Sequence, residues 1–253
     1  MSPFYLLDYN SNYTFPPSDR PRGVGPHPHR GFETATFAFR GKVAHHDSRG
    51  NSGVIGEGDV QWMTAGSGIL HKEYHEEEFS RAGGDFHMLQ LWVNLPKKDK
   101  MTEPKYQAIE NSQFGKFQVP GDMGVVDVVA GEYGGVKGTA STFSPLHIYI
   151  ARVKAGAKLD FSTPPNYNTG LVNLEGSLRI NGGEDVQVDN FVLFSNDGSE
   201  FSVEALEDSK YFILSGEPLN EPIASYGPFV MNTMGEIQQA MLDFNSGKFG
   251  HLD

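Results

Sequence analysis

The sequence predicts an antiparallel all-β fold with one helix near its end. Short runs rich in Val, Ile, Phe, Tyr and Thr recur along the chain, and 30 glycines and 15 prolines are distributed among them. Clusters such as "NGGED" and "SNDGSE" have the composition of tight turns. Only one segment has a clear helical pattern.

The strand-like runs lie in both halves of the chain. β-branched and aromatic residues suit a pleated, half-buried surface, so we expect each run to be a strand. In chain order they are "TATFAFRG", "MLQLWVNL", "HIYIARV", "TGLVNLEGSLRI", "NFVLFS" and "KYFILSG".

A helix is predicted around residues 233–246. Thr233 with Glu236 three residues later forms a capping box, and Gly247 is a suitable stop. The expected apolar stripe consists of Ile237, Met241 and Phe244.

A polar, proline-containing stretch around residues 94–106 divides the β-rich sequence. We therefore expect two barrels or sandwiches, one over residues 1–108 and one over residues 109–253 that includes the helix. The segments "GFETATFAFRGKVAHHDSRG" and "YNTGLVNLEGSLRINGGEDV" share a plan of apolar strand, glycine, short strand and turn. This similarity suggests that the halves are distant copies of one fold.

Composition excludes several classes of function. The net charge is −12, from 20 Lys and Arg against 32 Asp and Glu, which disfavours nucleic acid and anionic membranes as partners. There is no cysteine, so a metal site would have to use His, carboxylate or water. Neither a signal peptide nor a membrane span is recognisable, and we expect a cytoplasmic protein.

Two pairs of metal-ligand residues have the spacing of a strand face. His27 and His29 lie two apart just before the strand "FETATFAF", and His71 and Glu73 repeat that spacing. Residues i and i+2 of a strand point to the same side, so the four side chains can meet if the strands are neighbours. Imidazole and carboxylate without thiolate suit iron, manganese, copper, nickel or zinc.

Other interpretations compete with this one. Histidines among prolines often belong to a solvated loop, and "HKEYHEEE" is charged enough to be a surface segment. His71 and His75 would share the face of a helix, although the preceding "WMTAGSGIL" resembles a turn and strand. We expect His87 to be a core residue, and the glycines of "GEYGGVKG" to form β-turns rather than a phosphate site.

Four blocks closely resemble the pirins, a family of the cupin superfamily. They are "HPHRGFET", "GDVQWMTAGSGILHKEY", "LQLWVNLP" with "KMTEPKYQ", and "EPIASYGPFVMNTMGEIQQAMLDF". The resemblance spans nearly the whole chain and implies a bicupin, which is two tandem antiparallel barrels of jelly-roll type with a C-terminal helix. Pirins usually carry further residues before the block matching "SPFYLLDY", where this chain begins, so the first barrel is expected to lack a strand or the start to be truncated.

The resemblance also implies a metal site. His27, His29, His71 and Glu73 would bind one divalent transition metal in the N-terminal barrel, with Fe(II) the first expectation and Mn, Ni, Cu or Zn the alternatives. The wider cupin pattern would instead use Glu33 as the fourth ligand. The second half has "TPPNYNTG" at the corresponding place and only His147 and His251, so we expect no metal there.

Two functions follow from the resemblance. Several bacterial pirins are quercetin 2,3-dioxygenases, which implies a flavonol-like aromatic substrate, dioxygen, and a catalytic Glu73 that takes the proton of the 3-hydroxyl. Animal pirins are metal-dependent regulatory proteins, which implies protein partners instead. The sequence has no dense basic cluster beyond "KKDK" at 97–100, so it favours the enzyme.

Overall fold

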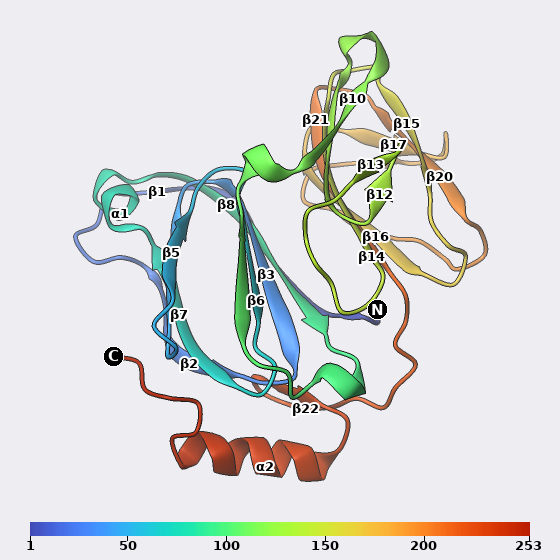
Figure 1. Ribbon diagram of the computed structural model, residues 1–253. Coiled ribbons are helices and arrows are strands. Elements are labelled where there is room, and N and C mark those ends of the chain that lie inside the picture. The colour runs from blue at the N-terminus through green and yellow to red at the C-terminus, as the bar shows by residue number, and fades with distance from the viewer. The chain divides into compact units, whose positions relative to one another are not determined.

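The computed structural model describes residues 1–253 and divides the chain into two compact units (Figure 1). One unit, here the first barrel, consists of Phe4–Asn111 and Asn220–Asp253. The other, the second barrel, consists of Met1–Pro3 and Ser112–Leu219. Each unit contains its own pair of antiparallel sheets.

The first barrel has a five-stranded sheet in the order β1-β8-β3-β6-β9 and a four-stranded sheet in the order β2-β7-β4-β5. Strands β1 and β2 are therefore edge strands of different sheets. The elements are β1 (Phe4–Phe15), β2 (Gly23–His29), β3 (Phe32–Arg40), β4 (Val43–Asp47), β5 (Ser52–Ile55), β6 (Val60–Thr64), β7 (Ile69–His75), α1 (Glu77–Ala82), β8 (Gly84–Asn94), η1 (Lys97–Asp99) and β9 (Lys105–Ile109).

A sharp turn between β2 and β3 separates the two sheets. His29 ends β2 and Phe32 begins β3, so Gly31 lies where the chain passes from one sheet to the other. Gly31 has φ +88°, and a Cβ there would lie 2.1 Å from the carbonyl oxygen of Val230. Only glycine fits this position. The histidine pair expected before the strand thus has a short strand of its own.

The second barrel has a six-stranded sheet in the order β10-β11-β14-β21-β16-β19, a four-stranded sheet in the order β15-β20-β17-β18, and a β12-β13 hairpin. The elements are η2 (Asn111–Gln113), β10 (Gly115–Val119), η3 (Pro120–Asp122), β11 (Gly124–Ala130), β12 (Glu132–Tyr133), β13 (Val136–Lys137), β14 (Leu146–Val153), β15 (Lys158–Ser162), β16 (Asn168–Glu175), β17 (Leu178–Ile180), β18 (Asp185–Val186), β19 (Phe191–Leu193), β20 (Glu200–Ala205) and β21 (Ser209–Gly216).

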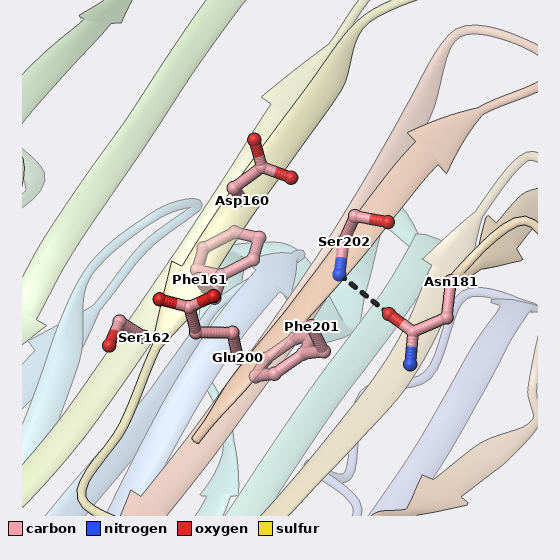
Figure 2. Close-up of a pocket in the computed structure, with 7 residues that line it drawn as sticks. All are labelled: Asp160, Phe161, Ser162, Asn181, Glu200, Phe201 and Ser202. Carbon is pink, nitrogen blue, oxygen red and sulfur yellow. Dashed lines mark hydrogen bonds between the residues drawn. The ribbon is translucent and has the colours of Figure 1, made fainter. Parts of the chain in front are cut away.

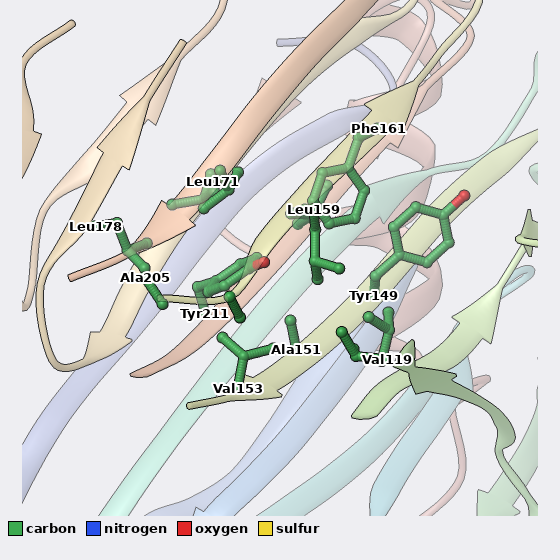
Figure 3. Packing of buried hydrophobic residues seen from close by; sticks show 14 of the residues in the cluster. Val119, Tyr149, Ala151, Val153, Leu159, Phe161, Leu171, Leu178, Ala205 and Tyr211 are labelled. Atoms are coloured by element: carbon green, nitrogen blue, oxygen red, sulfur yellow. The ribbon is translucent and has the colours of Figure 1, made fainter. Parts of the chain in front are cut away.

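Apolar side chains fill the interior of the second barrel (Figure 3). Tyr149, Phe161 and Tyr211 are almost fully buried there, and valines, leucines and alanines from both sheets surround them. Close packing of this kind stabilises the barrel through buried apolar area.

The fold class predicted from the sequence is confirmed. Two antiparallel barrels follow one another, each of two sheets, and one long helix closes the chain, which is the bicupin arrangement. All six strand-like runs lie in strands. The run "GEYGGVKG" forms the β12-β13 hairpin, with Gly134 and Gly135 at positive φ, as expected of β-turns.

The C-terminal segment lies in a different unit from the one expected. We placed residues 109–253 in a single second domain, whereas Asn220–Asp253 belong to the first barrel. The segment contains the hairpin β22 (Ala224–Tyr226) and β23 (Phe229–Met231), then helix α2 (Met234–Asn245). Val230 N–H donates to the Arg30 carbonyl at 3.1 Å, and Phe229 and Met231 are buried in one cluster with Ile237. These contacts attach the segment to the turn between β2 and β3.

Helix α2 has the predicted N-terminus but a different buried face. The capping box of Thr233 and Glu236 is present, with both hydrogen bonds formed. Met241 and Phe244 are 39% and 38% exposed, whereas Ala240 and Asp243 are buried beside Ile237. The apolar stripe that we expected is therefore correct only at Ile237.

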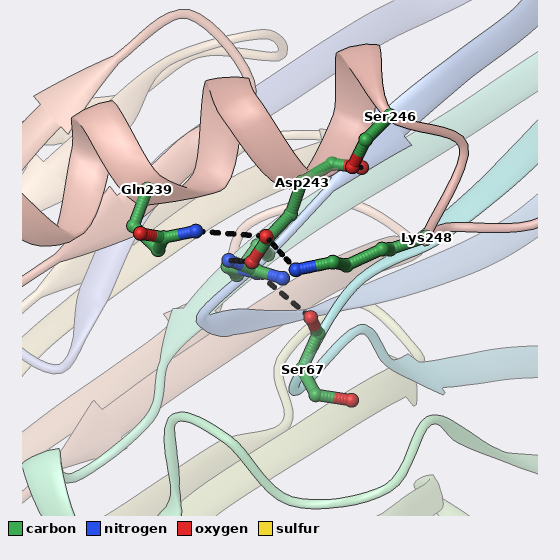
Figure 4. Close-up of polar contacts among 6 residues, drawn as sticks. Ser67, Gln239, Asp243, Ser246 and Lys248 are labelled. Atoms are coloured by element: carbon green, nitrogen blue, oxygen red, sulfur yellow. Dashed lines mark hydrogen bonds and ion pairs between the residues drawn. The ribbon is translucent and has the colours of Figure 1, made fainter.

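Asp243 is turned inward because it pairs with Arg30. Its Oδ2 accepts from Arg30 Nη1 at 2.9 Å, and its Oδ1 accepts from Lys248 Nζ and Gln239 Nε2 (Figure 4). The Arg30 Nε also donates to the Ser67 carbonyl at 2.7 Å. Hydrogen bonds from Lys248, then Gln239 and Arg30, lower the pKa of Asp243 well below its ordinary value. This pair connects α2 to the residue that directly follows His29.

Candidate metal centre

Three of the four candidate ligands converge inside the first barrel. Strand β2 pairs with β7 in the register His27 opposite His71, and His29 opposite Ile69. His27 and His29 share a face by the two-residue period of a strand, and His71 lies directly across from His27. A bulge between Val24 and His27 sets this register.

The three imidazoles are close enough to share one ion. One ligand atom from each of His27, His29 and His71 lies within 4.8 Å of the others. The ring centroids are 4.8 Å apart for His27 and His29, 4.2 Å for His27 and His71, and 4.8 Å for His29 and His71. Nitrogens bound to a common metal at about 2.1 Å each lie roughly 3–3.4 Å apart, so small side-chain movements would bring the three rings onto one ion.

The hydrogen bonding of these rings leaves nitrogen lone pairs available. Neither ring nitrogen of the fully buried His71 has a partner, and the same is true of Nδ1 of His29. The Nδ1 of His27 lies 2.8 Å from the Gly25 carbonyl, to which it donates, so its Nε2 carries the lone pair. Buried polar atoms without a partner are rare and call for an unseen ligand.

Burial keeps two of the rings neutral. Loss of solvent, then the neighbouring His71 and His27, lower the pKa of His29 well below its ordinary value. Burial, then His27 and His45, act in the same way on the pKa of His71. A neutral imidazole is the form that binds a metal.

Glu73 lies on the same inner face of β7 as His71 but is held by the opposite sheet. Its Oε2 accepts from Gln90 Nε2 at 2.9 Å, and its Oε1 accepts from Thr36 Oγ1 at 3.3 Å. Gln90 in turn accepts from the Trp92 indole N–H at 3.1 Å. The carboxylate is thus fixed by a chain of donors from β3 and β8 and lines the same cavity as His27 and His29.

Glu33, the alternative fourth ligand, points to the other face of its sheet. Strand β3 alternates, so Glu33 lies opposite in direction to Thr36, which contacts Glu73. The Glu33 Oε1 accepts from Thr64 Oγ1 at 2.7 Å, and burial raises the pKa of this carboxyl to about 7. Glu33 does not line the cavity described next.

A cavity of about 530 Å³ runs from the histidines along the barrel interior. That volume suits a ligand of two or three rings. Its exposed lining residues belong to the edge strands β1 and β2. The lining residues are Asp8, Asn10, Phe15, Arg22, Gly23, Val24, His27, His29, Thr36, Val43, Glu73, Tyr74, His75, Phe86, Met88, Gln90, Trp92 and Pro228.

Sequence reasoning missed several of these residues. Trp92 lines the cavity, with its ring centroid 5.1 Å from that of His29. Pro228 also lines the cavity, and the strand pattern of its segment gave no indication of this. Gln90 lies two residues before Trp92 in the run "MLQLWVNL". A polar residue at an inward position of an apolar strand is the one sequence feature that could have indicated a site here. His87 is fully buried on the other face of β8, as we expected of a core residue.

The second barrel has a shallow surface hollow instead (Figure 2). Asp160, Glu200 and Ser202 surround it, and the Asn181 side-chain oxygen accepts from the Ser202 N–H at 2.8 Å. His147 lies elsewhere in this barrel, half-buried beside Tyr149.

Comparison with known proteins identifies a family. The family model described as Pirin matches residues 1–93, and the one described as Pirin C-terminal cupin domain matches residues 148–250. A Pseudomonas aeruginosa protein named "Putative quercetin 2,3-dioxygenase" is 48% identical over 249 residues, covering 98% of this chain and 87% of the relative. Human Pirin is 37% identical over 257 residues, covering 99% and 83%.

A solved structure has the same fold over its length. The crystal structure of quercetin 2,3-dioxygenase from Acinetobacter baumannii superimposes with a TM-score of 0.95 at 49% identity, covering 100% of this chain and 88% of that one. No helix of the present chain is both long and apolar enough to span a membrane.

Proposed function

Because the chain belongs to the pirin family, we propose that it is a metal-dependent dioxygenase that opens flavonols such as quercetin. The single observation that carries the proposal is that three histidines, with ring nitrogens that make no hydrogen bond, converge at the end of a cavity lined by aromatic side chains. The name of the 49% identical structure supports the choice of flavonol.

In this proposal His27, His29, His71 and Glu73 hold one divalent ion, with Fe(II) expected first. The donor set fits such a group, since three neutral imidazoles and a carboxylate without thiolate suit first-row transition metals. Each oxygen of Glu73 accepts one hydrogen bond in the structure and keeps a further lone pair for an ion. When bound, the ion would supply Lewis-acid and redox chemistry.

The protein's own groups then have defined tasks. Glu73 would accept the proton of the substrate hydroxyl, because it lines the cavity two residues along the same face of β7 from His71. Gln90 and Thr36 hold that carboxylate in place. Trp92 and Met88 provide apolar walls for a flat ring system and exclude water from it.

The test is aerobic turnover by protein loaded with iron, manganese, nickel or copper. We expect loss of the long-wavelength absorbance of quercetin, consumption of dioxygen and release of carbon monoxide, all above the rate with free metal. A His29→Ala variant should lose this activity together with its metal while its circular dichroism stays β-like. Absence of turnover with every metal, in protein shown to be fully loaded, would reject the dioxygenase.

A further inference from the structure

The cavity extends well beyond the histidine cluster. Along β7 the inward residues are His71, Glu73 and His75, and only the first two belong to the proposed metal site. With a rise of about 3.3 Å per residue, the Cα atoms of His71 and His75 are about 13 Å apart. Both Glu73 and His75 line the cavity, so a ligand at the metal site can reach His75 only if it is long.

The far end of the cavity is an aromatic enclosure around His75. The centroid of the His75 ring lies 4.4 Å from that of Phe86 and 4.8 Å from that of Phe15. Phe15 comes from β1 and Phe86 from β8, so two strands of the five-stranded sheet surround one residue of the four-stranded sheet. Such a set of rings is suited to a further ring in edge-to-face or stacked contact.

The aromatic end of the cavity also contains an imidazole nitrogen of His75 and the guanidinium of Arg22. His75 is 6% exposed, and its Nδ1 has no hydrogen-bond partner. The guanidinium carbon of the half-buried Arg22 lies 5.4 Å from the centroid of the Phe15 ring, and Arg22 also lines the cavity. A buried nitrogen without a partner and a neighbouring positive charge together favour an acidic hydroxyl on the bound ring.

We propose that Phe15, Arg22, His75 and Phe86 form a second recognition subsite, which binds a pendant aryl ring bearing an acidic hydroxyl. The chelating part of the same molecule would lie at the histidine cluster, so the subsite selects elongated two-part aromatic compounds over single fused ring systems. This assignment rests on the proposed function, because it takes the histidine end as the place where the substrate is held.

The experiment is equilibrium binding to zinc-loaded protein without oxygen, with three probes that share the chelating group. Quercetin has a hydroxylated pendant ring, galangin has a bare one, and 3-hydroxychromone has none. We expect wild-type protein to bind galangin about tenfold more tightly than 3-hydroxychromone, a factor that corresponds to one well-packed aromatic contact. Quercetin should bind at least about tenfold more tightly than galangin, as one added hydrogen bond to a charged group would give.

Two variants separate the components of the subsite. Phe86→Leu should reduce the preference for galangin over 3-hydroxychromone to about twofold. Arg22→Gln should remove the preference for quercetin over galangin and leave the ring preference intact. Arg20→Gln is the matched control, because Arg20 is an exposed arginine of the same connection that does not line the cavity.

The outcomes distinguish the subsite from the proposed function. If wild-type protein binds all three probes within twofold of one another, or if Arg20→Gln acts like Arg22→Gln, the subsite is rejected whatever the iron enzyme does. If the predicted preferences appear but iron-loaded protein does not turn over any flavonol, the subsite stands and the dioxygenase fails.

Discussion

Replacement of Gln90 by leucine tests how the carboxylate of Glu73 is positioned. Gln90 Nε2 donates to Glu73 Oε2 at 2.9 Å and to Thr36 Oγ1 at 3.0 Å, while its Oε1 accepts from the Trp92 N–H at 3.1 Å. Leucine has a similar volume and removes all three hydrogen bonds. The cavity wall keeps its shape, so the change acts mainly on the orientation of Glu73.

The expected magnitude follows from the bond that is lost. A hydrogen bond to a charged group contributes about 1.5–3 kcal/mol, which corresponds to about 10- to 100-fold in an equilibrium constant. Loss of a residue that orients a metal ligand typically costs about 10- to 100-fold in affinity or activity. We therefore expect Gln90→Leu to weaken metal binding, flavonol turnover, or both, by about that factor.

The assay is competition for zinc against a chromophoric chelator, followed by turnover with the iron-loaded protein. Gln61→Leu is the matched control, since Gln61 is a buried glutamine on β6 that makes no hydrogen bond to Glu73. Thermal unfolding of both variants separates a local effect from general destabilisation. Metal affinity and turnover of Gln90→Leu within twofold of wild type would refute the positioning role.

Three further predictions concern the metal and the stability of the first barrel. Glu73→Ala should lose most bound metal and Glu33→Ala should retain it, because Glu73, unlike Glu33, lines the cavity together with the histidines. Metal analysis after dialysis measures this, and the reverse result would make Glu33 the ligand. Lys100→Met should lower the free energy of unfolding by about 3 kcal/mol, because three oxygen acceptors lose their hydrogen bonds from the buried ammonium. Urea unfolding measures this loss, with the exposed Lys98→Met as control, and equal effects of the two substitutions would contradict the prediction. Asp243→Asn should lower the melting temperature near neutral pH. Since the pKa of Asp243 is lowered by folding, its contribution is present above the ordinary value of 3.8 and is lost as the pH falls below it, so the gap to wild type should close in acid; a gap independent of pH would contradict the pairing.

The spacing of the candidate ligands along each strand could be read from the sequence, but the pairing of the two strands could not. The two-residue spacing of His27 with His29, and of His71 with Glu73, is local and sufficed to pair the side chains on strand faces. The register that sets His27 opposite His71 depends on a bulge in β2 and cannot be read from either segment alone. His27 and His71 are far apart in sequence and come together only because their strands pair in the folded barrel.

The C-terminal helix shows the same limit for the fold. Its capping box is a local pattern and was predicted correctly, with the helix beginning after Thr233. Its buried face depends on Arg30, more than two hundred residues away, which draws Asp243 inward and leaves Met241 exposed. The barrel to which the helix belongs is decided by such contacts and not by its position in the chain.

The central claim is that His27, His29 and His71 hold a single metal ion, and metal stoichiometry tests it most directly. Wild-type protein, His71→Phe and His147→Phe would each be loaded with zinc, dialysed and analysed for metal per chain by mass spectrometry. His71 is fully buried and phenylalanine is of similar size, while His147 provides a histidine of the second barrel as control. We predict about one ion per chain for wild type and His147→Phe, and close to none for a folded His71→Phe. Retention of a full equivalent by His71→Phe would contradict the claim.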